Sequence, residues 1–327
     1  MRLAPVAVDA MGGDFAPRAA VSGAVQAARR GIAVTLVGPS DTIAAELARH
    51  ARLGTLPIAI VHAPHVVTMA EAPLSALRRK PKTSIAVAVS LVASGRASAC
   101  FSAGHTGATL ITAHGAFGML PGVERPALAV ILPTRTGRTV LLDAGANAQC
   151  RASHLRQFGV MGAAYAQIAL EVANPRVGLL SIGEEAGKGN DLVKRAHAAL
   201  SDAPVDFIGN IEARELFNGR ADVIVCDGFT GNIALKVSEG LVETVELMLR
   251  DQLGARFDRV LPPKDMRRFR RRLDYAEHGA APLLGVSGLA LVGHGRSTAR
   301  AVLNGIATAA ALAEAKLVKR LAESLAF

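Results

Sequence analysis

Residues 221–236, ADVIVCDGFTGNIALK, contain the pattern on which the predicted fold depends. An apolar run at 222–226 ends at Asp227 and Gly228, and apolar residues then recur every four positions from Ile233. Short apolar runs that end in turn residues are typical of buried strands, whereas recurrence every three or four residues is typical of one face of a helix. The stretch therefore predicts a strand, a Gly-rich loop and a helix in immediate succession.

The same succession recurs on both sides of this stretch. We predict further strands at 5–9, 33–37, 58–61, 99–101, 127–132, 139–142, 177–182, 205–208 and 289–292. We predict helices at 16–30, 84–93, 155–171, 191–200 and 233–250. Strands that alternate with helices favour an α/β fold with a mostly parallel sheet covered on both faces. Ligands bind such sheets beyond the carboxyl ends of the strands, so the polar residues after each strand are the first candidates for a site.

Composition narrows the class of protein. Half of the 327 residues are hydrophobic, which supplies a large core and excludes a disordered chain. The formal net charge of +10 favours an anionic partner, but the absence of Trp and the presence of only two Tyr argue against a nucleic acid, which needs stacking platforms. Three cysteines without a CxxC pair, and a beginning without a signal-peptide pattern, predict a reducing cytoplasm.

Six predicted loops carry the residues that a phosphate-handling site needs. They are DAMGGD (9–14), SAGHTGA (102–108), LDAGAN (142–147), GEEAGKGN (183–190), CDGFTGN (226–232) and HGRS (294–297). Glycine lets a ligand approach the backbone, and the free N–H groups of a helix start bind anionic oxygens. No GxGxxG, Walker or HExxH motif occurs. We therefore expect the six loops to converge on one cleft that binds phosphate without cofactor or metal.

The same residues also have structural interpretations. Asp14 precedes a predicted helix, where such side chains often serve as N-caps, and Asn147, Asn190 and Asn232 have the same alternative interpretation. Lys188 follows a turn and is equally interpretable as a surface lysine. Cys226 lies within an apolar run, which predicts a buried, unreactive thiol rather than a covalent nucleophile.

Taken together, the longer motifs point to one family. DAMGGD with Pro17, SAGHTGA, LDAGAN with Cys150, LRQFGVMG (155–162), LLSIGEEAGKGN (179–190), FIGNIE (207–212), ADVIVCDGFTGNIALK, APLLGVSG (281–288) and GHGRS (293–297) together resemble the bacterial phosphate acyltransferase family. The resemblance runs in order from Val6 to about Ile306. His105 stands where the family usually has Asn, and Arg296 where a small residue is more usual.

The resemblance implies a fold and an activity. The fold is a three-layer α/β/α domain over 1–327, related to phosphate acetyltransferases and isopropylmalate dehydrogenases, with a helical dimerisation and membrane-facing subdomain at 229–280. The implied reaction converts long-chain acyl-[acyl-carrier protein] and inorganic phosphate to acyl phosphate for phospholipid synthesis. The implied protein is a cytoplasmic homodimer at the inner face of the membrane, and a membrane glycerol-phosphate acyltransferase is a possible downstream partner. The alternatives are a phosphate acetyl- or butyryltransferase acting on acyl-CoA, an NAD-dependent dehydrogenase and a basic scaffold.

This reaction assigns roles to the loop residues. Phosphate is itself the nucleophile, so the protein must hold it, aim it and stabilise the oxyanion. We expect Lys188 to neutralise phosphate and His294 to protonate the leaving thiolate or bind phosphate. The candidate donors to the oxyanion or to phosphate are Asn147, Asn190 and Asn232. The expected phosphate- and thioester-binding residues are Asp9, Gly12, Gly13, Asp14, Gly104, His105, Thr106, Gly107, Asn147, Asn190, Asp227 and Ser297.

Residues 250–272 form a basic segment. Nine basic residues oppose three acidic ones, a net charge of +6. Met266, Phe269 and Leu273 are spaced to share one helical face, which is typical of a packing stripe, a carrier-docking surface or a membrane-surface helix. The expected docking residues are Arg267, Arg268, Phe269, Arg270 and Arg271.

Overall fold

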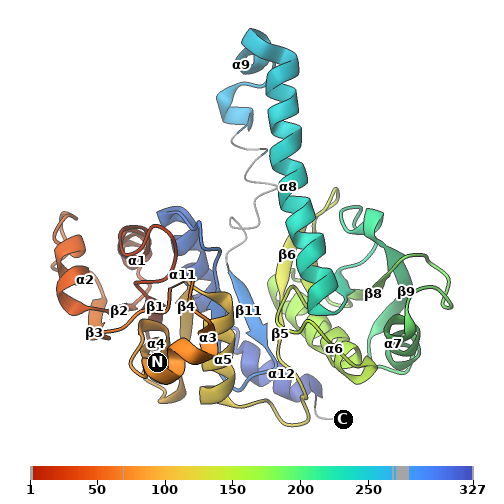
Figure 1. The fold of residues 1–327 in the computed structure, drawn as a ribbon, viewed down its shortest axis with the longest axis horizontal. Helices are drawn as coiled ribbons and strands as arrows, with labels where there is room; N and C mark the ends of the chain where they lie inside the picture. Colours follow the sequence, from red (N-terminus) through yellow and green to blue (C-terminus); the bar gives the residue numbers. More distant parts are fainter. Residues whose placement is uncertain (1–2, 69, 267–268, 270–279, 326–327) are drawn as a thin grey trace. The chain divides into compact units, whose positions relative to one another are not determined.

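The computed structural model describes residues 3–68, 70–266, 269 and 280–325. Its contacts divide the chain into two compact units: unit 1 comprises Met1–Pro126 and His278–Phe327, and unit 2 comprises Ala127–Glu277. Each unit is built on a mostly parallel sheet with helices, which confirms the predicted α/β class (Figure 1). The interpretation of 1–327 as one domain with a helical subdomain at 229–280 stays a prediction.

Unit 1 is centred on a sheet in which the strands follow the order β3-β2-β1-β4-β12-β11. All are parallel except β11, which runs antiparallel to β12. The strands are β1 (Val6–Asp9), β2 (Val34–Gly38), β3 (Ile58–His62), β4 (Ala99–Ser102), β11 (Ala281–Leu284) and β12 (Ala290–Val292). The helices are α1 (Arg18–Arg29), α2 (Ser40–Leu47), α3 (Pro73–Arg79), α4 (Ser84–Ala93), α5 (Thr106–Phe117), α11 (Ala299–Glu314) and α12 (Leu317–Leu325).

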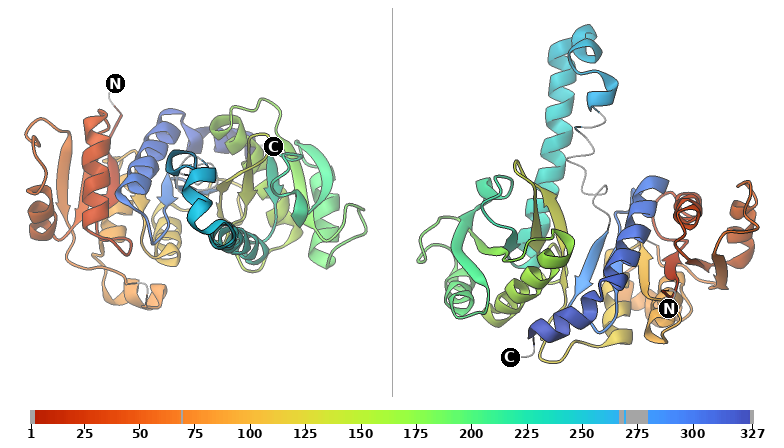
Figure 2. Two further views of the ribbon diagram at one scale, coloured as in Figure 1. Left: turned by 90° about the horizontal axis from the view of Figure 1, so that it is seen from above. Right: turned by 180° about the vertical axis from the view of Figure 1, so that it is seen from behind.

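Helices cover the sheet of unit 1 on both faces. Helices α1 and α11 pack together on one face, and α4 and α5 pack together on the other (Figures 1 and 2). The contact between α1 and α11 depends on Gly23, because a methyl group built there would lie 2.6 Å from Cβ of Val302. The strands between these layers are buried throughout in β1, β2 and β4.

Unit 2 has a second sheet, with the order β6-β7-β10-β8-β9. Only β6 is antiparallel to its neighbour. The strands of the unit are β5 (Ala127–Leu128), β6 (Val130–Pro133), β7 (Arg138–Leu142), β8 (Arg176–Ser181), β9 (Asp206–Glu212) and β10 (Val223–Val225). Its α-helices are α6 (Ala152–Ala169), α7 (Asp191–Ser201), α8 (Gly228–Leu253) and α9 (Phe257–Val260), and short 3₁₀ turns lie at Ala213–Glu215 and Gly254–Arg256.

Helices α2, α3, α5, α9, α11 and α12 lie outside the predicted helix ranges, and three further differences concern the strands and α8. The strand expected at 127–132 is two strands, because the amide of Leu128 donates to the Asp143 carboxylate instead of continuing the ladder. Strand β11 was not predicted, because Pro282 is a poor strand residue. In the structure Pro282 lies in β11, which pairs antiparallel with β12. Helix α8 begins at Gly228 rather than at 233, because Asp227 caps it.

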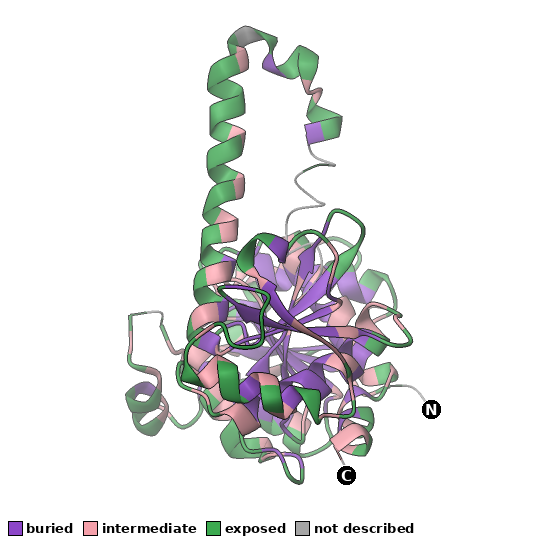
Figure 3. Ribbon diagram, turned by 90° about the vertical axis from the view of Figure 1, so that its right-hand side faces the viewer, coloured by how far each residue is buried: buried purple, intermediate pink, exposed green. Residues whose placement is uncertain are grey.

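Helix α8 extends away from the sheet of unit 2 and is exposed along much of its length (Figure 3). The apolar residues that recur every four positions along α8 are exposed in this chain and are not part of its core. They are Ile233, Val237, Leu241 and Val245. Among the described residues, no single helix is long and apolar enough to cross a membrane; only α11 and α12, bent by 54° between them, reach that length and composition together.

We predict opposite effects for alanine at two helical glycines. In α6, a methyl group at Gly162 would lie 2.5 Å from Cγ1 of Val223, whereas a methyl group at Gly115 in α5 would meet nothing within 4 Å. Gly162→Ala should lower the free energy of unfolding by roughly 1–3 kcal/mol through overpacking. Gly115→Ala should raise it by up to about 1 kcal/mol. Urea unfolding measures both, and a stabilising Gly162→Ala would show that α6 can move away from the sheet.

Candidate active site

The six predicted loops form two groups of three. In unit 1 they follow β1, β4 and β12, which are neighbours in the sheet, and in unit 2 they follow β7, β10 and β8, which are also neighbours. Because these strands are parallel within each sheet, each group lies at the carboxyl edge of its own sheet. Within each unit the three loops therefore lie together, and the convergence of all six loops on one cleft stays a prediction.

A buried carboxylate joins two loops of unit 1. Asp9, the last residue of β1, accepts hydrogen bonds from the Ser102 hydroxyl at 2.7 Å and from the Met11 amide at 3.1 Å. Ser102 in turn accepts from the Gly104 amide at 3.1 Å. Burial raises the pKa of Asp9, and these donors oppose that rise. A methyl group at Gly12 would lie 2.7 Å from the Gly104 nitrogen, so only glycine permits the loops to come this close.

The third loop of unit 1 meets the first. The amide of Asp14 donates to the carbonyl of Gly295 at 2.8 Å, and the hydroxyl of buried Ser297 donates to the carbonyl of His294 at 2.6 Å. Nδ1 of His294 accepts from the amide of Arg296 at 3.1 Å. A ring that accepts through Nδ1 is neutral and carries its proton on Nε2. His294 therefore has a defined donor atom, whereas Ser297 closes the turn.

The start of α5 has the features of an anion site. His105 is its N-cap residue but makes no capping hydrogen bond with its side chain, and Thr106 and Gly107 form the first turn. Nδ1 of His105 is buried and has no hydrogen-bond partner among the described residues. The free N–H groups of a first turn and a polar ring atom beside them are suited to an anionic oxygen.

In unit 2, the carboxylate of Asp143 organises the loop after β7. Asp143 is fully buried, and its two oxygens accept five hydrogen bonds. The donors are the amides of Leu128, Gly145, Ala146 and Asn147 and the Asn147 side chain, at 2.7–3.0 Å. Burial raises the pKa of Asp143, and these donors act in the opposite direction. The Asn147 amide group is thus committed in part to holding its own loop.

The loop after β10 packs on this one. The amide of Gly228 donates to the carbonyl of Asn147 at 2.8 Å, and a methyl group at Gly228 would lie 2.7 Å from Oδ2 of Asp143. Asn232, one turn into α8, is exposed, and a methyl group on Gly145 would lie 3.6 Å from its Oδ1. The amide of Asn232 is therefore beside the LDAGAN loop.

The loop after β8 presents Lys188. This side chain is exposed, and within the described residues no carboxylate lies within ion-pair distance of its ammonium. Buried Asn210 on β9 holds the loop by donating to the carbonyl of Glu185 at 2.9 Å. Because the Asn210 amino group is used there, its Oδ1 accepts from Nδ1 of His197 at 2.9 Å. Glu184 adds an ion pair to Arg220 at 3.2 Å.

The structure decides between the two interpretations of the helix-start residues. Asn190 is the N-cap of α7, and Asp227 is the N-cap of α8; each accepts the amide three residues further on at 2.9 Å. Asp14 is not a cap, since Pro17 occupies the N-cap position of α1. Asn190 and Asp227 therefore position their loops, and their carboxyl or amide oxygens are already in use.

Two of the three cysteines, Cys100 and Cys226, do not have the properties of nucleophiles. Burial raises the pKa of Cys100 to about 12, and burial also raises the pKa of Cys226 well above that of an ordinary thiol. Thiols of this kind are not ionised near neutral pH. This agrees with the prediction of an unreactive Cys226.

Three positioning residues were absent from the predicted site: Ser102, Asp143 and Asn210. All lie within motifs that the sequence contains, but their partners are distant along the chain or are backbone atoms. The sequence signal that could have identified them is a polar residue within or directly after an otherwise apolar strand.

In the described part of the basic segment, Met266 fits the packing interpretation. Met266 is buried, as is Phe257 of α9, so Met266 is used in packing and does not form an exposed stripe with Phe269. Phe269 is 47% exposed. The predicted docking residues Arg267, Arg268, Arg270 and Arg271, together with Leu273, lie outside the described residues.

Solved structures with a similar fold include phosphotransacetylases and 4-hydroxythreonine-4-phosphate dehydrogenases. A phosphotransacetylase from Streptococcus pyogenes is 18% identical, with a TM-score of 0.63 and coverage of 94% of each chain. A 4-hydroxythreonine-4-phosphate dehydrogenase from Klebsiella pneumoniae is 15% identical, with a TM-score of 0.56 and coverage of 95% of this chain and 99% of that one. These likenesses support the predicted relation of the folds.

Sequence relatives identify the family. The model of the family described as "Fatty acid synthesis protein" matches residues 4–320. The phosphate acyltransferase of Desulforudis audaxviator is 49% identical over 97% of this chain and 95% of its own length. That of Acidobacterium capsulatum is 47% identical over 98% of this chain and 96% of its own length. With its two groups of Gly-rich loops and near-complete coverage of these relatives, the chain belongs to the phosphate acyltransferase family.

Proposed function

We propose that this phosphate acyltransferase takes its acyl group from a long-chain acyl-[acyl-carrier protein] and yields acyl phosphate and free carrier protein. The observation that carries the proposal is the position of Lys188. Its ammonium is exposed on a loop that Asn210 and Arg220 hold in place, and the other loops offer backbone donors. An ammonium on a fixed loop suits the compact charge of inorganic phosphate. The basic segment at 250–272, with a net charge of +6, suits the acidic carrier.

The first step is attack of a phosphate oxygen on the thioester carbonyl carbon. We assign Lys188 to neutralising phosphate charge, with further contacts from the backbone of the DAMGGD and SAGHTGA loops and from His105. Direct contact between phosphate and the Asp9, Asp14 or Asp227 carboxylates would be repulsive, so these residues act by holding donors in place. A held phosphate reacts as if intramolecular, which removes much of the entropic part of the barrier.

The second step is collapse of the tetrahedral intermediate. The developing oxyanion is stabilised by N–H donors, for which we assign the side-chain amide of Asn232. The C–S bond then breaks, and the thiolate takes a proton. In the neutral ring Nε2 of His294 carries a proton, and we assign this N–H to donating a hydrogen bond to the leaving sulfur. The proton that the thiolate takes comes from the attacking hydrogen phosphate, whose remaining hydroxyl is more acidic once the phosphate is acylated.

The assay that tests the proposal compares two thioesters with the same long acyl chain. Acyl phosphate, trapped with hydroxylamine, should form from acyl-[acyl-carrier protein] in proportion to phosphate, without added NAD and with EDTA present. Acyl-CoA should be used more slowly. Faster turnover of acyl-CoA would favour the phosphate acetyl- or butyryltransferase alternative, and a requirement for NAD would contradict the proposal.

Lys188→Ala should lower kcat/KM, because it removes the cation of the proposed site. The expected loss corresponds to roughly 2–4 kcal/mol of transition-state stabilisation. Lys194→Ala is the matched control, since Lys194 is an exposed lysine on the following helix α7. Circular dichroism and thermal melting check that both variants fold. A rate within about threefold of the parent would make Lys188 a surface residue.

We propose further that residues 229–280 form a subdomain for dimerisation and docking. The exposed row Ile233, Val237, Leu241 and Val245 on α8 is the proposed contact with a second copy. The tip, with exposed Phe269 and the basic segment, is the proposed contact with anionic membrane and carrier protein. A membrane glycerol-phosphate acyltransferase would then receive acyl phosphate at the cytoplasmic face.

Phe269→Glu should weaken binding to anionic vesicles in co-sedimentation while leaving activity on soluble carrier substrate nearly unchanged, because interfacial helices need apolar burial as well as charge. Leu74→Glu, on similarly exposed Leu74 of α3, is the control. Reversal of Arg270 and Arg271 to Glu should also weaken vesicle binding and raise KM for the carrier substrate. Loss of the dimer or of soluble activity in Phe269→Glu, with vesicle binding intact, would make Phe269 a packing residue.

A further inference from the structure

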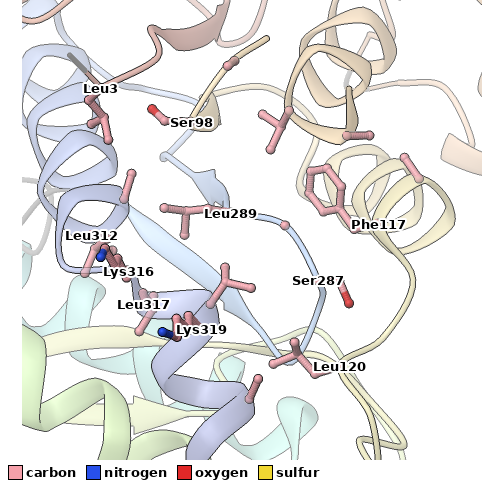
Figure 4. A pocket seen from close by; sticks show the side chains of 18 residues that line it. Leu3, Ser98, Phe117, Leu120, Ser287, Leu289, Leu312, Lys316, Leu317 and Lys319 are labelled. Carbon is pink, nitrogen blue, oxygen red and sulfur yellow. The ribbon is translucent and has the colours of Figure 1, made fainter. Parts of the chain in front are cut away.

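Unit 1 contains a cavity of about 590 Å³ away from its loop cluster (Figure 4). Leu3, Ser98 and Leu289 line it, and these residues come just before β1, β4 and β12. The predicted phosphate-binding loops follow the same three strands at their other ends. Strands of three or four residues span about 10–13 Å, so the cavity and the loops are at opposite edges of one sheet.

The wall of this cavity is mainly apolar. Helices α4, α5, α11 and α12 contribute to it together with the segment before β12. Its larger apolar side chains are Val92, Phe117, Leu120, Leu289, Leu312 and Leu317. Sites for small molecules usually have volumes of about 300–1,000 Å³ and apolar walls with a few polar groups, so the size and lining are those of a ligand site.

The charged groups at the cavity are two lysines. Lys316 and Lys319, both exposed, line it from the bend between α11 and α12, and none of the lining side chains in the described part of the chain is acidic. The ammonium of Lys319 is 3.6 Å from Glu323, and both side chains are largely exposed, so this pair is weak. An occupant with an apolar chain and a negative head would satisfy both parts of the cavity.

We propose that this cavity binds a single-chain amphiphile with an anionic head group, such as a fatty carboxylate or an alkyl phosphate. The chain lies against the apolar wall, and the head lies at Lys316 and Lys319. The sheet separates this ligand from the predicted phosphate-binding loops, so it is a second site for an acyl compound and not the position of the reacting thioester.

The chain has no tryptophan, which permits a direct binding test. Ala116 lines the cavity from the exposed end of α5, so Ala116→Trp provides a single fluorescent reporter there. The full chain is titrated below micellar concentrations with laurate, dodecyl phosphate and uncharged dodecyl maltoside. We expect a saturable emission change with an anionic probe and a parallel rise in the melting temperature of the parent protein. The relative affinities of laurate and dodecyl phosphate distinguish the carboxylate from the phosphate head.

Removal of the two charges tests the proposed head-group contact. Lys316→Asn combined with Lys319→Gln, in the reporter background, should weaken anion binding roughly fivefold or more, as expected for two partly exposed ion pairs. Asn is chosen because Lys316 has φ of 55°, a conformation that Asn tolerates. Arg320→Gln, on an exposed α12 cation outside the cavity, should change nothing. No saturable binding, equal binding of dodecyl maltoside, or unchanged affinity in the double variant would overturn the proposal.

Discussion

A buried aspartate at the end of a strand is the constraint on which each loop group depends. Asp143 in unit 2 holds four backbone amides, and Asp9 in unit 1 holds one amide and the Ser102 hydroxyl. A carboxylate in such a place is costly unless donors surround it, so the loop must fold around it. Each of these loops also meets a neighbouring loop through a glycine that leaves no room for a side chain, Gly12 in unit 1 and Gly228 in unit 2. The two units thus use the same physical arrangement.

The elements of the sheets were largely predictable because their signal is local. The apolar runs at 5–9, 99–101 and 222–226 correspond to β1, β4 and β10, and the helix predicted at 84–93 matches α4. The errors arose where a distant group overrides the local pattern. The Asp143 carboxylate takes the amide of Leu128 and divides one apolar run into β5 and β6. The two glycines of CDGFTGN, Gly228 and Gly231, suggest a loop, but both belong to α8.

The site was predictable as a set of loops but not as a set of contacts. Motif position predicted that Lys188, Asn232 and His294 lie beyond the ends of strands, and they follow β8, β10 and β12 in the structure. Their roles in a site stay a prediction. Their roles depend on partners that sequence does not pair, as with Asn210, 25 positions from the carbonyl that it holds. Met266 shows the same limit for packing, because periodicity placed it on a face but did not reveal that the face is covered.

The hydrogen bonds around Asp9 and Asp143 decide when the entropic cost of ordering these loops arises. Loops that are free in solution must be ordered when substrate arrives, which reduces affinity and slows the approach to reactive geometry. Here the loop amides around Asp143 are ordered by protein groups alone. The cost of fixing that backbone is met once, during folding. Each turnover then begins from a preorganised surface, and binding energy remains available for the transition state.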